Sequence, residues 1–96
     1  MIVDAENVRR SVWPNIAAPE LVELVERWAE REGHHALVVF EGEETADEVI
    51  ARWAAAPDGQ YWLVTSDREL RARAGEAAER VVGGGTFARM LRDLAA

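Results

Sequence analysis

The chain has 96 residues, of which 49% are hydrophobic and 30% charged, which excludes a disordered segment and predicts one small domain over residues 1–96. Its net charge of −7 argues against binding nucleic acid by general electrostatic attraction over the whole surface. The chain contains no cysteine, so disulfides and thiolate metal sites are excluded. It has neither a long apolar run nor a signal-like start, so we expect a cytoplasmic protein that does not bind membranes.

Charge is distributed unevenly along the chain. Residues 20–48 contain ten acidic residues and two arginines, whereas residues 68–93 contain six arginines and four acidic residues. The basic residues are all arginines, which suit bidentate contacts with phosphate, although replacement of Lys by Arg in a GC-rich genome explains the same composition.

The first half of the chain predicts two strands separated by a loop and a helix. Residues 2–4 form a short apolar strand, and residues 8–18 contain a proline and lack periodicity, so we expect a loop there. Apolar residues recur at helical spacing over residues 19–33, from a proline to a glycine. HALVVF at residues 35–40 is typical of a strand buried on both faces.

The second half predicts three helices and two strands. Capping boxes, in which Ser or Thr is followed three residues later by Glu, begin helices at Thr45 and Ser66. YWLVT at residues 61–65 is a strand between them, and residues 80–82 form another. The glycines that follow predict a loop, after which Thr86 can cap a last helix.

Alternating strands and helices predict an α/β fold with a parallel sheet and helices on both faces. We expect the strand order 2-1-3-4, with the switch point between the first and third strands. Asp4 ends the first strand, Asp67 follows the third, and Asp47 lies in the first turn of the helix after the second. All three carboxylates are therefore expected at the carboxyl edge of the sheet, where such folds bind ligands.

Converging carboxylates repel one another unless a cation lies among them. Hard oxygen ligands suit Mg²⁺ or Mn²⁺, which activate water and stabilise the oxygens of an in-line phosphodiester displacement. A structural explanation is also available for Asp47 and Asp67, because acids in a first turn stabilise the helix dipole by ~0.3–1 kcal/mol. Asp4 is harder to explain in that way, since a polar group at a strand end needs a partner. Glu6 is expected to be a solvated charge.

Three segments follow one another in the order of a known pattern: IVDAEN at residues 2–7, ETADEVIARW at 44–53 and LVTSDREL at 63–70. They resemble the PIN-like nucleases and, within these, the NYN/YacP-like branch. The resemblance covers most of the chain. It implies an α/β/α sandwich and metal-dependent hydrolysis of RNA, here expected to be single-stranded.

The resemblance also implies roles for individual residues. Catalytic and metal-binding roles fall on three aspartates: Asp4, Asp47 and Asp67. Glu44 matches a glutamate of the family's pattern that either binds the metal or holds water. Supporting roles fall on Asn7, Ser66 and Thr86. From their positions near the predicted site, four arginines are candidates for contact with RNA phosphates: Arg9, Arg10, Arg68 and Arg71.

Other functions stay open. In longer members of the family, a loop that helps to cover the substrate lies where residues 40–44 of this chain pass directly into the next helix. The missing loop and the acidic composition are both compatible with a non-cleaving RNA-binding or protein-interaction module. A phosphoaspartate signalling domain also collects acids at strand ends, but those families use a lysine that this chain lacks. An open edge strand and a small core are compatible with a homodimer. Trp13 can stack on a base or cover an apolar edge, and the second is the expectation.

Overall fold

The computed structural model describes residues 1–40, 48, 61–75 and 78–95. The helix expected from Thr45 lies outside the described residues except for Glu48, which is helical and exposed. Among the described helices, none combines the length and the apolar character needed to cross a membrane.

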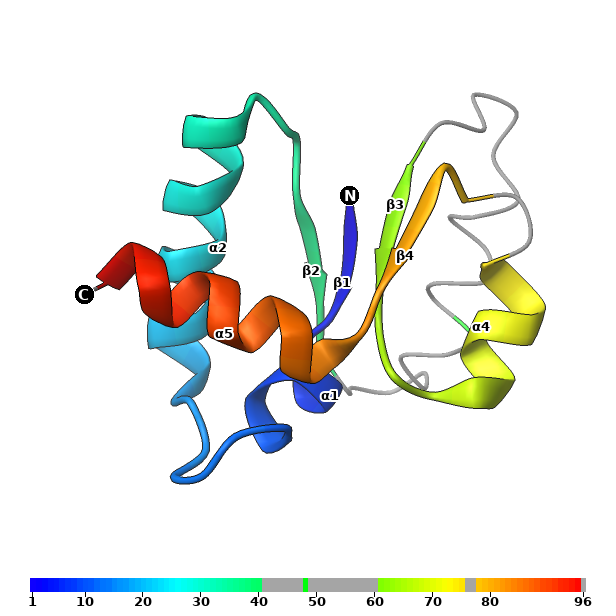
Figure 1. Cartoon of the computed structure of the whole chain (residues 1–96), viewed down its shortest axis with the longest axis horizontal. Coiled ribbons are helices and arrows are strands. Elements are labelled where there is room, and N and C mark those ends of the chain that lie inside the picture. Colours follow the sequence, from blue (N-terminus) through cyan, green and yellow to red (C-terminus); the bar gives the residue numbers. More distant parts are fainter. Residues whose placement is uncertain (41–47, 49–60, 76–77, 96) are drawn as a thin grey trace.

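Four short strands form one parallel sheet (Figure 1). They are β1 (Ile2–Asp4), β2 (Leu37–Val39), β3 (Trp62–Val64) and β4 (Arg80–Val82). The order β2-β1-β3-β4 confirms the predicted order 2-1-3-4. All four carboxyl ends therefore lie at one edge of the sheet, at the bottom of the view in Figure 1.

The helices cover both faces of the sheet, as predicted for an α/β fold. Helices α2 (Ala18–Glu32) and α5 (Gly84–Ala95) pack on one face, and α4 (Arg68–Ala74) lies on the other (Figure 1). The short helix α1 (Ala5–Arg10) follows β1 directly and contacts α2 and α5 below the sheet edge.

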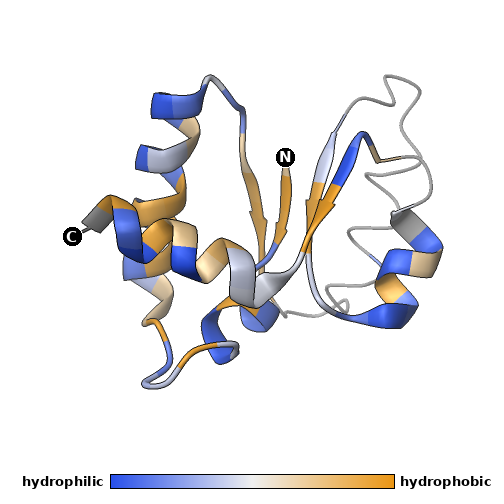
Figure 2. Ribbon diagram, in the orientation of Figure 1, coloured by the Kyte–Doolittle hydropathy of each residue, from blue (hydrophilic) through white to orange (hydrophobic). Residues whose placement is uncertain are grey.

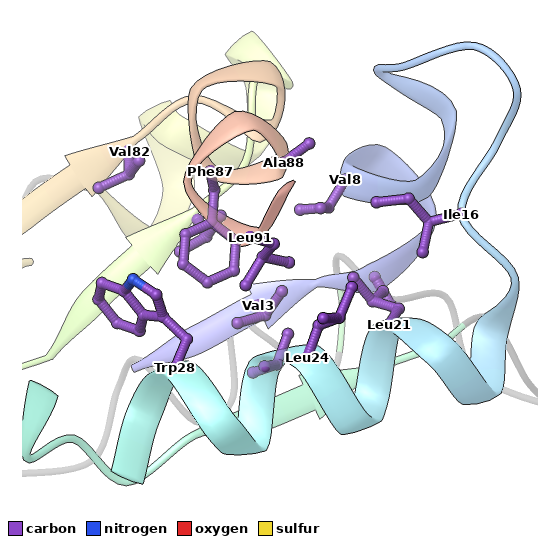
Figure 3. Close-up of a cluster of buried hydrophobic side chains, with 13 residues drawn as sticks. Val3, Val8, Ile16, Leu21, Leu24, Trp28, Val82, Phe87, Ala88 and Leu91 are labelled. Carbon is purple, nitrogen blue, oxygen red and sulfur yellow. The ribbon is translucent and has the colours of Figure 1, made fainter. Parts of the chain in front are cut away.

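The alternation of side chains along the strands divides the core in two. Val3, Val64 and Val82 face α2 and α5, in the larger cluster shown in Figure 3. Their chain neighbours Ile2 and Leu63 face the opposite way, into a smaller cluster on the α4 side. In Figure 2 the apolar colour is accordingly concentrated on the strands and on the inner sides of α2 and α5.

An aromatic cluster closes the amino edge of the sheet, opposite to the carboxyl ends. Trp28 of α2 meets Phe87 of α5 edge-on at 5.3 Å between ring centroids and is stacked on His34 at 5.5 Å. His34 also lies 4.5 Å from Trp62, and the guanidinium of Arg80 lies 4.8 Å from the ring centroid of Trp62. These contacts join the first residues of β3 and β4 to helices α2 and α5 on one face of the sheet.

Three local expectations are wrong. The loop expected over residues 8–18 begins later, because α1 extends to Arg10; its two buried residues, Ala5 and Val8, are too few to give a periodic pattern. The glycine loop is also shorter than expected, since α5 already begins at Gly84. Finally, the amino end of the second strand is not buried on both faces, because Leu37 on the outer strand β2 is 36% exposed.

The left-handed backbone conformation at the end of α2 can be tested by substitution. Gly33 has φ +74° and caps α2 in the left-handed conformation, which costs an L residue about 1–2 kcal/mol. We expect Gly33→Ala to lower the free energy of unfolding by about 1 kcal/mol and Gly33→Asn by less, because Asn tolerates this conformation. Urea titration measures both. Equal losses for the two variants would contradict the conformational explanation, since no atom lies within 4 Å of the Cβ that would be added.

Candidate functional site

The carboxyl edge of the sheet carries an open pocket of about 430 Å³. We call it the carboxylate pocket, and its described lining comes from β1, α1 and the β3–α4 junction: Asp4, Glu6, Asn7, Arg10, Ser11, Ser66 and Asp67. Two of the predicted metal ligands, Asp4 and Asp67, thus line one pocket, together with the predicted supporting residues Asn7 and Ser66. The parallel pairing of β1 with β3 brings these distant segments together.

Thr65 connects the two aspartates. Its hydroxyl donates a hydrogen bond to Asp4 Oδ2 at 2.9 Å and accepts one from the backbone N–H of Asp67 at 3.1 Å. Thr65 is fully buried, and Asp4 is only 6% exposed. A buried carboxylate is costly unless it is hydrogen-bonded, so Thr65 both stabilises Asp4 and fixes the start of the Asp67 turn.

Asp67 has a structural role of its own. It is the N-cap of α4, and its Oδ1 accepts a hydrogen bond from Leu70 N at 3.0 Å. The expected capping by Ser66 is therefore wrong: the helix begins one residue later, and the cap is an aspartate. An N-cap carboxylate is stabilised by the helix dipole, yet Asp67 remains exposed at the pocket.

Asn7, Ser66 and Gly84 form a network across the three strand ends. Asn7 Oδ1 accepts a hydrogen bond from Ser66 N at 2.8 Å, and Ser66 Oγ accepts one from Gly84 N at 2.8 Å. A Cβ on Gly84 would collide with Asn7 Oδ1. The Asn7–Ser66–Gly84 network therefore requires glycine where α5 begins, and it holds α1, the β3–α4 junction and α5 in one arrangement.

Glu6 is engaged by two arginines, so the expectation of a solvated charge is wrong. Its carboxylate accepts two hydrogen bonds from Arg9 Nη1, at 2.8 and 2.9 Å, and lies 3.3 Å from Arg10 Nε. Arg9 Nε also donates to the carbonyl of Ile16 at 2.7 Å. Arg9 thus has internal partners, whereas Arg10 reaches the pocket and its side chain is 71% exposed.

The other predicted RNA-binding and supporting residues differ in position. Arg71 donates from Nε to the carbonyl of Thr65 at 2.9 Å, which again braces the end of β3. Arg68 is exposed at the start of α4, and Thr86 is exposed in the first turn of α5. Neither is among the described residues that line the carboxylate pocket. Contact of any of these side chains with RNA stays a prediction.

The metal site stays a prediction as well. Asp47 and Glu44 lie outside the described residues. Within the described ranges, no group of three or more His, Cys, Asp or Glu side chains is arranged to hold a metal ion. The donors that are present nevertheless fit Mg²⁺, because this ion commonly binds through one or two carboxylates and completes its shell with water and substrate oxygens. Asp4 and Asp67 provide carboxylates of this kind on an open pocket.

Comparisons with known proteins add no relative. No family model, no curated protein and no solved structure matches the chain. The likeness to PIN-like nucleases therefore rests on the three sequence segments alone.

Sequence reasoning missed three residues that shape the pocket. Thr65 was an ordinary β-branched strand residue, Gly84 part of a glycine-rich loop and Glu6 one of many acids. Only Glu6 had a local signal, since Arg9 and Arg10 follow it at the i+3 and i+4 spacing that brings opposite charges together on a helix.

The bridge through Thr65 gives a stability prediction. Thr65→Val keeps the shape but removes the donor to Asp4 and the acceptor for Asp67 N–H, so we expect a loss of about 1–3 kcal/mol in the free energy of unfolding. Thr65→Ser keeps the hydroxyl and should lose only the contribution of one methyl group, about 0.8 kcal/mol. Urea titration in EDTA compares the two. Thr65→Val matching the wild type would show that the hydroxyl is dispensable.

Two adjacent glycines of α5 provide a matched pair. Gly84→Ala forces a Cβ against Asn7, and we expect it to lower the free energy of unfolding by about 1–3 kcal/mol. In Gly85→Ala the added Cβ meets only Ser11 Cβ at 3.9 Å and Arg89 Nη1 at 4.0 Å, so stability should not fall. Thermal unfolding of both variants is the measurement. If Gly85→Ala lowered the free energy of unfolding as much as Gly84→Ala, the loss would come from replacing a glycine in this turn and not from the collision with Asn7.

Proposed function

We propose that this protein is a metal-dependent ribonuclease of the PIN-like type, which cleaves single-stranded RNA at the carboxylate pocket. The observation that carries the proposal is that Asp4 and Asp67, from two different strand ends, line the same open pocket and are joined through Thr65. The resemblance assigns these two aspartates to the reaction. A purely structural pair would not require an opening of this size beside them.

In this proposal Asp4 and Asp67 would hold Mg²⁺ or Mn²⁺, together with Asp47 and Glu44 from the part of the chain outside the described residues. Such an ion would supply activation of water and stabilisation of charge on phosphate oxygens. Thr65 keeps the Asp4 carboxylate oriented by donating to Oδ2. The Asn7–Ser66–Gly84 network holds the pocket walls, and Arg10 supplies positive charge at the rim.

A second candidate is a non-cleaving module on the same fold, which binds RNA or a protein. It is favoured by the absence, within the described residues, of a third acidic side chain arranged with the other two to hold a metal. Cleavage measurements separate the two candidates.

The proposal also covers location and assembly. A ribonuclease without cysteine or a membrane-crossing segment among its described helices fits the cytoplasm. A homodimer would use the β2 edge, where Leu37 is 36% exposed on an outer strand.

Cleavage of a short unstructured RNA with millimolar Mn²⁺ tests the proposal. We expect Asp67→Asn and Asp4→Asn to be at least about 100-fold slower than the wild type, since loss of even an outer-shell partner costs 10–100-fold. Asn caps a helix as well as Asp does, so Asp67→Asn should retain its fold. Glu69→Gln makes the same change in charge at an exposed position of α4 and is the matched control.

Product is measured on denaturing gels, with EDTA as the blank. Wild-type protein that leaves the RNA intact in Mn²⁺, or aspartate variants that cleave at the wild-type rate, would refute the ribonuclease. Intact RNA that is nevertheless bound by the wild type would favour the non-cleaving module.

A further inference from the structure

Trp13 is 85% exposed, the most exposed large hydrophobic residue of the described chain. The expectation that it covers an apolar edge is wrong, because so exposed a ring covers almost nothing. Single exposed apolar residues are common and need no function by themselves. The case for a function comes from the way in which the loop carrying Trp13 is held and from the residues beside it.

The loop is anchored on both sides of Trp13. Before it, Ser11 Oγ donates to the carbonyl of Val8 at 2.6 Å. After it, Ile16 is paired with Arg9: Arg9 Nε donates to the Ile16 carbonyl at 2.7 Å, and Ile16 N donates to the Arg9 carbonyl at 3.3 Å. Ile16 is also buried in the main core cluster. The exposure of Trp13 is therefore set by an ordered loop, which lowers the entropy cost of binding a partner on its ring.

A cation precedes Trp13 by three residues, at the rim of the carboxylate pocket. Glu6 contacts Arg10 through Nε, and no hydrogen bond within the described chain engages the two terminal amino groups of Arg10. Those groups can meet two oxygens of one phosphate. Ser11, between Arg10 and Trp13, also lines the pocket. Three residues of chain span at most about 11 Å, so Arg10 and Trp13 are close enough for one short ligand.

We propose that Arg10 and Trp13 form a docking element for an unpaired nucleotide of an RNA strand, with a phosphate on Arg10 and a base stacked on Trp13, next to the carboxylate pocket. The inference rests on the proposed function and specifies its substrate class as strands with unstacked bases. A duplex keeps its base faces inside its own stack and has none to offer to Trp13. A phosphate and a ring side by side match the exposed cation and the exposed indole better than an apolar protein surface does.

The test is binding of a fluorescently labelled oligouridine in EDTA, where metal-dependent cleavage does not occur. Base stacking on an aromatic residue is worth about 5- to 150-fold in affinity, and we expect a loss of that size in Trp13→Ala. Trp13→Phe keeps a ring and should retain most of the affinity. Asn15→Ala, at another exposed position of the same loop, should bind like the wild type.

Salt dependence distinguishes the two halves of the element. Arg10→Gln should reduce the slope of log affinity against log salt by about 0.7, the value for one phosphate contact on a single strand. Trp13→Ala should weaken binding without changing that slope, because stacking releases no counterions. A blunt-ended RNA duplex of the same length, which has no unpaired nucleotide, should bind equally to wild type and Trp13→Ala.

Several results would overturn the inference. These are unchanged oligouridine binding in Trp13→Ala, the same loss for a blunt-ended duplex and the single strand, and no detectable oligouridine binding by the wild type. A change of oligomeric state on gel filtration in Trp13→Ala would instead identify the indole as a contact between copies. Failure of the ribonuclease is a separate result, since it is measured as Asp67-dependent cleavage. Cleavage that persists with unchanged binding in Trp13→Ala removes only the docking element.

Discussion

The hydroxyl of Thr65 is the point at which the two acidic strand ends are joined. Asp4 ends β1 inside the protein, where a carboxylate must be supplied with donors. Thr65, at the end of the neighbouring strand, supplies one and at the same time receives the N–H that precedes α4. The direction of the chain after β3 and the orientation of Asp4 are thereby coupled. Arg71 strengthens the same point from α4 by binding the Thr65 carbonyl.

Close backbone approach is the second constraint on the site. The first turn of α5 lies against Asn7, and only glycine leaves room for the Asn7 side chain at Gly84. Ser66 then joins the two, as an acceptor through its hydroxyl and a donor through its backbone N–H. Residues expected to act as supporting groups for a ligand are therefore also the links between three junctions of the fold. Their structural role does not conflict with the proposed site, because a reaction site needs rigid walls.

The order of the strands could be predicted from the sequence because it depends on local signals: short apolar runs, a helix that ends at Gly33, and turn residues between these segments. The details of the site depend on contacts between distant residues and had no such signal. Thr65 and Asp4 are 61 residues apart, so nothing near YWLVT marks its last residue as a partner for a carboxylate. The glycines before Thr86 resemble a loop because glycine disfavours helices, but contact with Asn7 outweighs that preference at Gly84. Asp47 and Glu44 lie outside the described residues, so their predicted roles stay predictions.

Under the proposed function, a protein with a net charge of −7 must bind a polyanion, and the arrangement of its charges bears on how it would do so. The two aspartates of the pocket follow strand ends, and Asp4 is buried, whereas Arg10 is exposed at the rim. Glu6 holds that arginine in place through Nε, and no hydrogen bond from the described residues engages its terminal groups. In the proposed reaction, a phosphate would meet the cation first and would be repelled by the carboxylates until a metal ion offset their charge. Under the proposed function, metal and RNA therefore favour each other's binding, and by linkage the effect is equal in both directions. The acidity of the pocket then makes productive contact with RNA conditional on the ion.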